Sequence, residues 1–247
     1  MSKEAIVYFS GGKDSVMAVW KARQLGYDIK CAVNFKTGGE HDQDSALVEA
    51  VAAAIGINDV RYEIMSYEAA QETLNKEGYV VDLETSQERI STVFDAIKAD
   101  YPNVKYVIFG IDDVQPTETI YMRKAHSNGM TAVNPFAMRY HLEFWDDVIE
   151  QDLELRLQFP VEAYLSSSNY NGRRIEGADA QRVVDSFNGH QVGDVLDASL
   201  MKSQYDSQQN FGLWSAAQTI VTNGKMFTAP VPVEVDAVKN KLVLASS

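Results

Sequence analysis

The sequence predicts an α/β fold built on a doubly wound parallel sheet with helices on both faces. Three observations lead to this fold class. Short apolar runs alternate with longer amphipathic stretches through the first 137 residues, as strands and helices do when they follow each other in turn. A glycine-rich turn joins the first apolar run to the first helical stretch. Gly26 and Gly56 stand where the first two helical stretches should end.

The strands of this sheet are expected at five apolar runs: 5–9, 29–35, 60–65, 105–109 and 131–134. Strands that are buried on both faces of a parallel sheet read as continuous apolar runs, and these do. The helices are expected at 16–25, 46–55, 67–76, 86–99 and 117–127, with Asp44 or Ser45 capping the second. Ligands of such sheets bind beyond the carboxyl ends of the strands, so the functional site is expected at that edge.

The regular alternation of apolar runs and amphipathic stretches ends near residue 137, which predicts a second and smaller α+β unit. A charged helix is expected over 143–158, a strand over 161–165 and another helix over 178–187. Asn223-Gly224 lies between two β-prone runs, which predicts a hairpin over 219–227. We therefore divide the chain into domains 1–137 and 138–247.

The amino-acid composition argues against several classes of protein and kinds of site. Of 247 residues, 22 are Lys or Arg and 35 are Asp or Glu, so the net charge is −13. The negative electrostatic potential of such a protein repels polyanions, so a broad surface that binds nucleic acid is disfavoured. The single cysteine, Cys31, excludes an intrachain disulfide and a cysteine-rich zinc site. No signal-peptide pattern or membrane-length apolar run is present, so we expect a cytoplasmic protein without a membrane partner; a homodimer is one option for its assembly.

The most informative stretch, Ser10-Gly11-Gly12-Lys13-Asp14-Ser15, joins the first strand to the first helix. Adjacent glycines let the backbone approach a ligand closely, and the N–H groups at a helix start favour an anion. Lys13 adds a positive charge, and Ser10 and Ser15 add hydroxyl donors. Asp14 would repel a phosphate by itself, so it is expected to hold a Mg²⁺ ion that bridges to one. The stretch therefore predicts a polyphosphate site.

This loop is not the common P-loop, because the pattern G-x-x-x-x-G-K-[ST] is absent. It resembles, residue for residue, the SGG-x-DS loop of the PP-loop ATP pyrophosphatases, which split ATP into AMP and pyrophosphate. Residues 109–112, 129–136 and 218–227 resemble, in this order, segments of the diphthine–ammonia ligase (diphthamide synthase) family within that group. The resemblance implies a HUP-like first domain that binds ATP (adenine nucleotide alpha hydrolase-like) and a second domain that binds the acceptor substrate.

The chain departs from this family near its end. The family carries a Gly-Glu-Gly-Gly-Glu run followed by His-Thr, where this chain has Gly212–Ala217 and then Gln218. The acidic residues and the histidine are missing, so we expect a shared fold with a changed acceptor pocket.

The resemblance also implies residue roles. Lys13, Asp14 and Ser15 would be catalytic, and Mg²⁺ would be held by Asp14 with Asp112 or Asp113. Asn34 and Phe35 would flank the adenine with backbone groups and a ring face. The residues expected to bind ATP are Ser10, Gly11, Gly12, Lys13, Asp14, Ser15, Asn34, Phe35, Gly110 and Asp112.

The reaction implied is amide formation on a carboxylate of a small molecule or a protein. The carboxylate attacks the α-phosphorus of ATP, pyrophosphate leaves, and ammonia then displaces AMP. No cysteine near the amino terminus can serve as a glutaminase nucleophile, so ammonia would be free or supplied by another chain.

Two alternatives stay open. A PP-loop enzyme could modify a nucleotide or a nucleic-acid base, although the acidic composition and the lone cysteine count against it. The chain could also be a nucleotide-binding module without catalysis, although the presence of both Lys13 and Asp14 counts against that.

Overall fold

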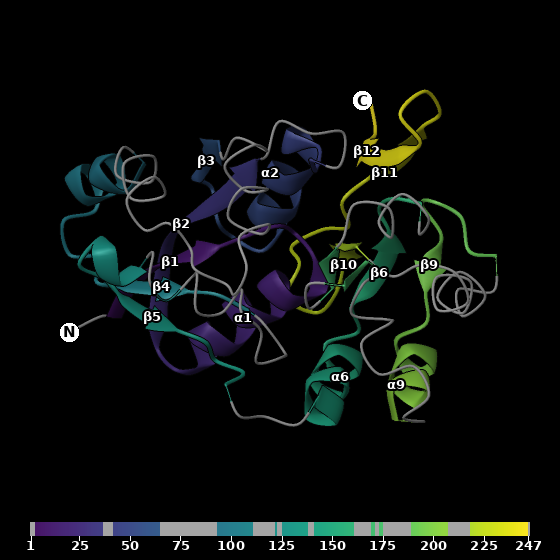
Figure 1. Cartoon of the computed structure of the whole chain (residues 1–247), viewed down its shortest axis with the longest axis horizontal. Helices are drawn as coiled ribbons and strands as arrows, with labels where there is room; N and C mark the ends of the chain where they lie inside the picture. The colour runs from purple at the N-terminus through teal and green to yellow at the C-terminus, as the bar shows by residue number, and fades with distance from the viewer. Residues whose placement is uncertain are drawn as a thin grey trace.

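The computed structural model describes residues 3–36, 42–64, 93–110, 122, 125–137, 141–160, 169–170, 173–174, 189–206 and 218–246. Its main element is a five-stranded sheet of order β3-β2-β1-β4-β5, in which all neighbours are parallel. The strands are β1 (Lys3–Tyr8), β2 (Tyr27–Lys36), β3 (Val60–Ile64), β4 (Tyr106–Ile108) and β5 (Thr131–Val133). The α/β class and the five strands expected from the sequence are therefore confirmed, and the sheet agrees with a HUP-like fold (Figure 1).

Helices α1 (Lys13–Gln24) and α2 (Ser45–Ala54) lie close to their expected positions. The Asp44 carboxylate caps α2 by accepting a hydrogen bond from the Leu47 N–H at 2.8 Å. Residues 93–100 and 125–127 are also helical, and the expected helix at 67–76 lies outside the described residues. Among the residues that the structure describes, no helix has the length and apolar composition needed to cross a membrane.

Two apolar clusters fill the two faces of the parallel sheet. Successive residues of β1 alternate between them: Val7 belongs to the cluster that contains α1 and α2, and Ile6 belongs to the other. Phe94 and Ile97 of the helical segment 93–100 cover the second face. A sheet buried on both faces requires strands that are apolar throughout, which explains why these runs could be found in the sequence.

The rest of the chain forms smaller elements beside this sheet (Figure 1). A three-stranded antiparallel sheet has the order β10-β6-β9, and the remaining strands form two-stranded pairs. Two helices in this part of the chain pack on each other. The elements are α6 (His141–Glu150), β6 (Glu154–Leu157), β7 (Asn169–Tyr170), β8 (Arg173–Arg174), β9 (Val195–Leu196), α9 (Ala198–Asp206), β10 (Thr219–Asn223), β11 (Val233–Asp236) and β12 (Lys241–Leu244).

The helix expected over 143–158 is wrong in its second half. Helix α6 ends at Glu150, and Asp152 takes a left-handed conformation with φ of 52°. Beyond it, Glu154–Leu157 alternates partly exposed and buried residues, which is the period of a strand. That alternation was present in the sequence, but the acidic run before it resembled a continuing helix.

The hairpin expected over 219–227 is also wrong. β10 does occupy Thr219–Asn223, but its antiparallel partner is β6 rather than residues 225–227. After Gly224 the chain makes a turn in which the Phe227 N–H donates to the Gly224 carbonyl at 2.9 Å. The Asn-Gly signal marked a turn correctly, while burial of β10 against β6 decided the pairing. The expected elements at 161–165 and 178–187 lie outside the described residues.

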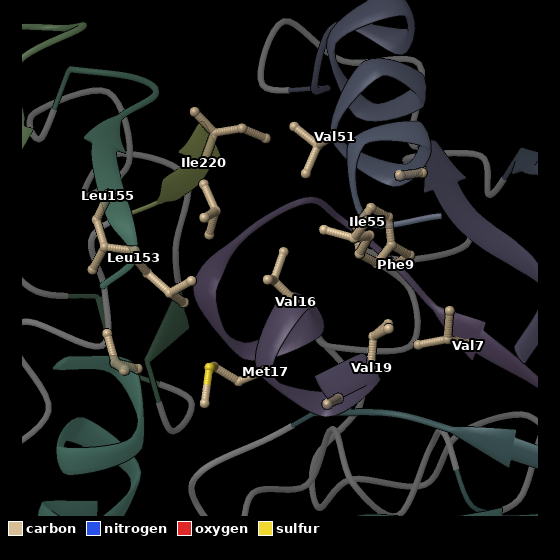
Figure 2. Close-up of a cluster of buried hydrophobic side chains, with 14 of the residues drawn as sticks. Val7, Phe9, Val16, Met17, Val19, Val51, Ile55, Leu153, Leu155 and Ile220 are labelled. Carbon is tan, nitrogen blue, oxygen red and sulfur yellow. The ribbon is translucent and has the colours of Figure 1, made fainter. Parts of the chain in front are cut away.

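One apolar cluster crosses the expected domain boundary at 137/138. Figure 2 shows Val16 and Met17 of α1 facing Leu153, Leu155 and Ile220 from the second half of the chain. These side chains are all buried. The two halves thus share a core, and their division into domains stays a prediction.

Replacing Ile220 tests this shared core. Ile220 is fully buried, so Ile220→Ala should lower the free energy of unfolding by about 2–5 kcal/mol through lost contacts and a cavity. Val238→Ala is the control, because Val238 is 95% exposed and should change stability little. Denaturant unfolding of both variants, followed by circular dichroism, measures the difference. Equal effects would contradict a core shared between the halves.

Cys31 offers a chemical probe of the same fold. It lies fully buried in β2, and burial raises the pKa of its thiol to about 12. Since the thiolate is the reactive form, native protein at neutral pH should not react with a thiol reagent. Denatured protein should react with one equivalent, because the sequence has a single cysteine. Rapid labelling of the native protein would show that β2 is not enclosed as described.

Candidate functional site

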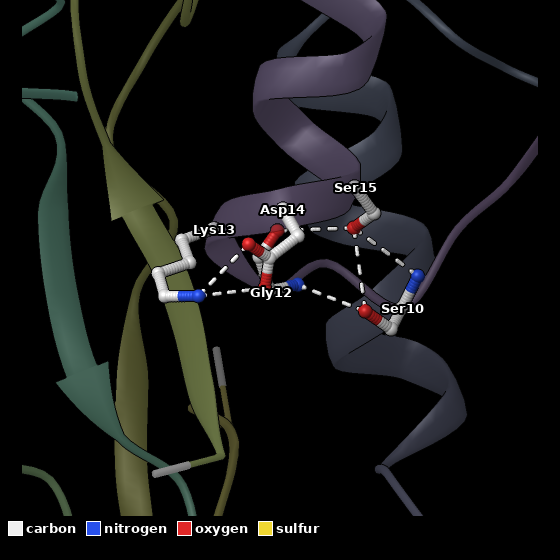
Figure 3. Close-up of polar contacts among 5 residues, drawn as sticks. All are labelled: Ser10, Gly12, Lys13, Asp14 and Ser15. Carbon is white, nitrogen blue, oxygen red and sulfur yellow. Dashed lines mark hydrogen bonds and ion pairs between the residues drawn. The ribbon is translucent and has the colours of Figure 1, made fainter. Parts of the chain in front are cut away.

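The loop from β1 to α1 is held in shape by its own serine hydroxyl groups (Figure 3). The Ser15 hydroxyl donates to the Gly12 carbonyl at 3.0 Å and lies 3.3 Å from the Ser10 hydroxyl. The Ser10 Oγ accepts from the Gly12 N–H at 3.3 Å. Gly12 is the N-cap of α1 and provides no side-chain cap. The start of α1 therefore presents backbone N–H groups and two hydroxyls, which is a suitable arrangement for an anion.

Three glycines are required here, two because other backbone packs closely against them and one because of its backbone conformation. A Cβ at Gly110, after β4, would lie 2.1 Å from the Asp14 carbonyl oxygen. A Cβ at Gly12 would lie 2.9 Å from the Thr219 carbonyl oxygen, and Gly11 has φ of 75°. The Gly11 carbonyl also accepts a hydrogen bond from the Val221 N–H at 2.9 Å. The loop is thus packed between the end of β4 and the edge of β10.

Lys13 points toward the second half of the chain. Its ammonium donates to both carboxylate oxygens of Asp14, at 2.7 and 2.8 Å. It also lies 5.4 Å from the ring centroid of Phe144 and 5.5 Å from that of Trp145, both on α6. The Lys13 side chain is 3% exposed, whereas that of Asp14 is 34% exposed. Lys13 therefore contacts Asp14 and the aromatic residues of α6, while Asp14 stays accessible.

A cavity of about 370 Å³ opens at the carboxyl ends of β1, β2 and β4. This edge includes the point between β1 and β4 where the strand order reverses, a usual ligand position in such sheets. The cavity wall comes from both halves of the chain. The lining residues are Tyr8, Phe9, Ser10, Asp14, Ser15, Val33, Asn34, Phe35, Asp42, Gln43, Phe109, Gly110 and Gln218.

Asn34 is the most deeply buried polar side chain of this wall, at 3% exposed. Its amide nitrogen donates to the Phe9 carbonyl at 2.8 Å and to the Gln43 side-chain oxygen at 3.2 Å. Its side-chain oxygen is buried and has no hydrogen-bond partner. A buried acceptor without a donor is unfavourable by about 1–3 kcal/mol, so this atom is a candidate ligand contact.

Aromatic rings form the apolar part of the wall. The rings of Tyr8 and Phe35 meet edge to face with their centroids 5.0 Å apart. Phe109 lies on the same wall and is buried. Flat apolar surfaces of this kind suit a planar ring, whereas the serines and Asp14 suit a polar, charged group. The cavity can therefore accommodate a ligand with both parts.

Two lysines hold the segment before α2 against the cavity. The Lys36 ammonium donates to the Gln43 carbonyl, and the Lys241 ammonium donates to the Asp42 carbonyl at 3.0 Å. Burial lowers the pKa of Lys36. Lys241 belongs to β12, so the second half of the chain helps to position a residue that lines the cavity.

The site residues expected from sequence fall into three groups. Ser10, Asp14, Ser15, Asn34, Phe35 and Gly110 line the cavity. Gly11, Gly12 and Lys13 belong to the same loop and helix start but are not among the lining residues. Asp112 and Asp113 lie outside the described residues, so their roles stay predictions.

Sequence reasoning missed several residues of this wall. Asp42 and Gln43 belong to a polar loop that was expected near the strand ends, but no motif marked them individually. Tyr8 was expected only as a strand residue, and Phe109 only as a strand end within the segment 109–112 that resembles the family. Gln218 was noted as a replacement of the family histidine, and the structure places it on the cavity wall. Its distance from Ser10 along the chain explains why only tertiary structure could join the two.

Comparison with known proteins finds a family model that matches a segment in the first half of the chain. Residues 3–104 match the family model of the diphthamide synthase N-terminal domain. The chain also resembles the crystal structure of a predicted subunit of tRNA methyltransferase from Methanocaldococcus jannaschii, with 14% identity and a TM-score of 0.44. That likeness covers 90% of this chain and 97% of the other, and it is too distant to carry a functional argument. No curated protein matches this chain in sequence. The family match thus makes residues 3–104 similar to a diphthamide synthase N-terminal domain.

Proposed function

We propose that this protein is an ATP pyrophosphatase-type ligase that converts a carboxylate into an amide. The carboxylate oxygen attacks the α-phosphorus of ATP, the bond to the β-phosphate bridge breaks, and pyrophosphate leaves. Ammonia then attacks the acyl carbon of the adenylate, and AMP leaves with the bond electrons while the nitrogen loses a proton. The observation that supports this most is the shared cavity of Ser10, Asp14 and Ser15 with the aromatic wall.

The loop residues would act by holding the phosphates in place. Backbone N–H groups at the start of α1 and the Ser10 hydroxyl would donate hydrogen bonds to phosphate oxygens, and the Ser15 hydroxyl would do so on turning away from the Gly12 carbonyl. Such fixed donors stabilise charge that develops as pyrophosphate leaves, without needing to reorganise during the reaction. Aromatic residues around the cavity would limit water near the reactive acyl-adenylate.

Asp14 fits the role of a magnesium ligand. Its carboxylate is accessible, lines the cavity and supplies the hard oxygen ligands that Mg²⁺ prefers. Mg²⁺ is commonly bound by one or two carboxylates together with phosphates, so Asp14 can serve in such a site. When bound there, the ion would neutralise negative charge on the phosphates. Asp112 and Asp113 stay candidates for further ligands.

Lys13 would contribute through Asp14. The ammonium contacts the Asp14 carboxylate directly, so it can fix the direction in which that carboxylate faces the cavity. The aromatic residues Phe144 and Trp145 in turn hold the ammonium. A direct contact between Lys13 and phosphate stays a prediction from the motif.

The products of ATP turnover test the proposed reaction. With Mg²⁺, ammonium and a mixture of small carboxylic acids, the protein should form AMP and pyrophosphate, resolved by chromatography of labelled ATP. Asp14→Ala should reduce the rate by about 100-fold or more, because charge on the phosphates loses its support. Asp28→Ala is the matched control, since Asp28 lies at the opposite end of β2 and is 48% exposed.

The product pattern also separates the alternatives. ADP and orthophosphate as products would overturn the ligase proposal. ATP binding without turnover, with every carboxylate and with nucleic acid, would favour a binding module. AMP formation that depends on a nucleotide or nucleic-acid acceptor would favour base modification.

The half-buried ion pair of Lys13 and Asp14 at the start of α1 makes a separate stability prediction. Lys13→Met should lower the free energy of unfolding by about 1–3 kcal/mol, because the Asp14 carboxylate loses a charged partner. The control is Lys202→Met, which breaks the exposed Lys202–Asp146 pair and should cost under about 1 kcal/mol. Denaturant unfolding at low and high salt distinguishes them, since salt screens the exposed pair more strongly. Equal losses in the free energy of unfolding would show that the Lys13–Asp14 pair stabilises the fold no more than an exposed ion pair does.

A further inference from the structure

We propose that the side-chain oxygen of Asn34 selects the nucleobase by accepting a hydrogen bond from the amino group at position 6 of adenine. This inference rests on the proposed function, because it assumes that the cavity binds a nucleoside triphosphate. It assigns base selectivity to one side-chain atom, whereas the motif in the loop concerns only the phosphates.

The orientation of the Asn34 amide follows from its neighbours. The Phe9 carbonyl can only accept hydrogen bonds, and it lies 2.8 Å from the Asn34 nitrogen. Rotating the amide by 180° would set two acceptors against each other. The nitrogen must therefore face Phe9, which directs the side-chain oxygen away from it.

The unpaired oxygen requires a donor from outside the described protein atoms. Asn34 is 3% exposed, its oxygen has no partner, and the residue lines the cavity. A ligand in that cavity can supply the donor and remove the cost of the buried acceptor. An unprotonated phosphate oxygen cannot do so, because it only accepts hydrogen bonds.

The wall around Asn34 favours a base as the donor. Tyr8, Phe35 and Phe109 line the same cavity and present the apolar surface that a planar heterocycle contacts. In the adenine base of ATP, the exocyclic amino group at position 6 is the only group with N–H donors. Hypoxanthine carries a carbonyl oxygen at this position, which would leave two acceptors facing each other in a buried site.

Binding of ATP and inosine triphosphate measures this selectivity. The unaltered protein should bind ATP roughly 10- to 100-fold more tightly than inosine triphosphate, in titration calorimetry with Mg²⁺ present. Asn34→Leu, which is similar in volume and lacks the acceptor, should bring the ratio of the two dissociation constants close to one. The ratio is the informative quantity, because a purely structural defect would weaken both nucleotides alike.

Gln43→Leu is the matched control. It removes the second partner of the Asn34 nitrogen but keeps the Asn34 oxygen, so the ratio should be retained even if both affinities fall. If Asn34→Leu does not fold, Asn34→Ala, which also lacks the acceptor, and the ratio for the unaltered protein give the same test.

Three results would overturn the inference. Equal binding of ATP and inosine triphosphate by the unaltered protein would show that position 6 is not read, while AMP formation would leave the proposed function standing. A retained ratio in the Asn34 variants would assign the reading to another group. Binding of neither nucleotide would overturn this inference and the proposed function together.

Discussion

The contact between strand β10 and the loop before α1 fixes the shape of the candidate site. The Val221 N–H bonds to the Gly11 carbonyl, the Thr219 carbonyl lies against Gly12, and Ile220 packs beside Gly11. Only glycine permits such close approach of a neighbouring strand. The loop therefore keeps its shape because a strand about 200 residues further along the chain supports it.

Near this contact, a positive charge is enclosed by the protein and a negative charge is accessible at the cavity. The Lys13 ammonium is enclosed by Asp14 and two aromatic rings, so its charge is largely balanced within the protein. Asp14 keeps part of its carboxylate accessible at the cavity. An anionic ligand would then depend on backbone N–H groups, hydroxyls and a bound cation rather than on a free lysine. This differs from the common P-loop, in which the lysine reaches the phosphates itself.

The sequence was sufficient for features that depend on neighbouring residues. Apolar runs located all five parallel strands, and Asp44 was named as one of two possible caps of α2. It was insufficient where pairing partners are distant. The second half of 143–158 became β6 because a strand there can pair with β10 and β9, and an acidic composition could not reveal those partners. The hairpin at 219–227 failed for the same reason.

For the site, the sequence by itself determined the strand, glycine loop and helix that present Ser10, Asp14 and Ser15, because backbone geometry there is set by adjacent residues. Only the tertiary structure decided what faces this loop: Gln218 on the cavity wall, α6 against Lys13, and an Asn34 amide turned by the Phe9 carbonyl. Those contacts join residues that are distant in the chain, and their energy comes from burial and hydrogen bonding that exist only after the halves pack together.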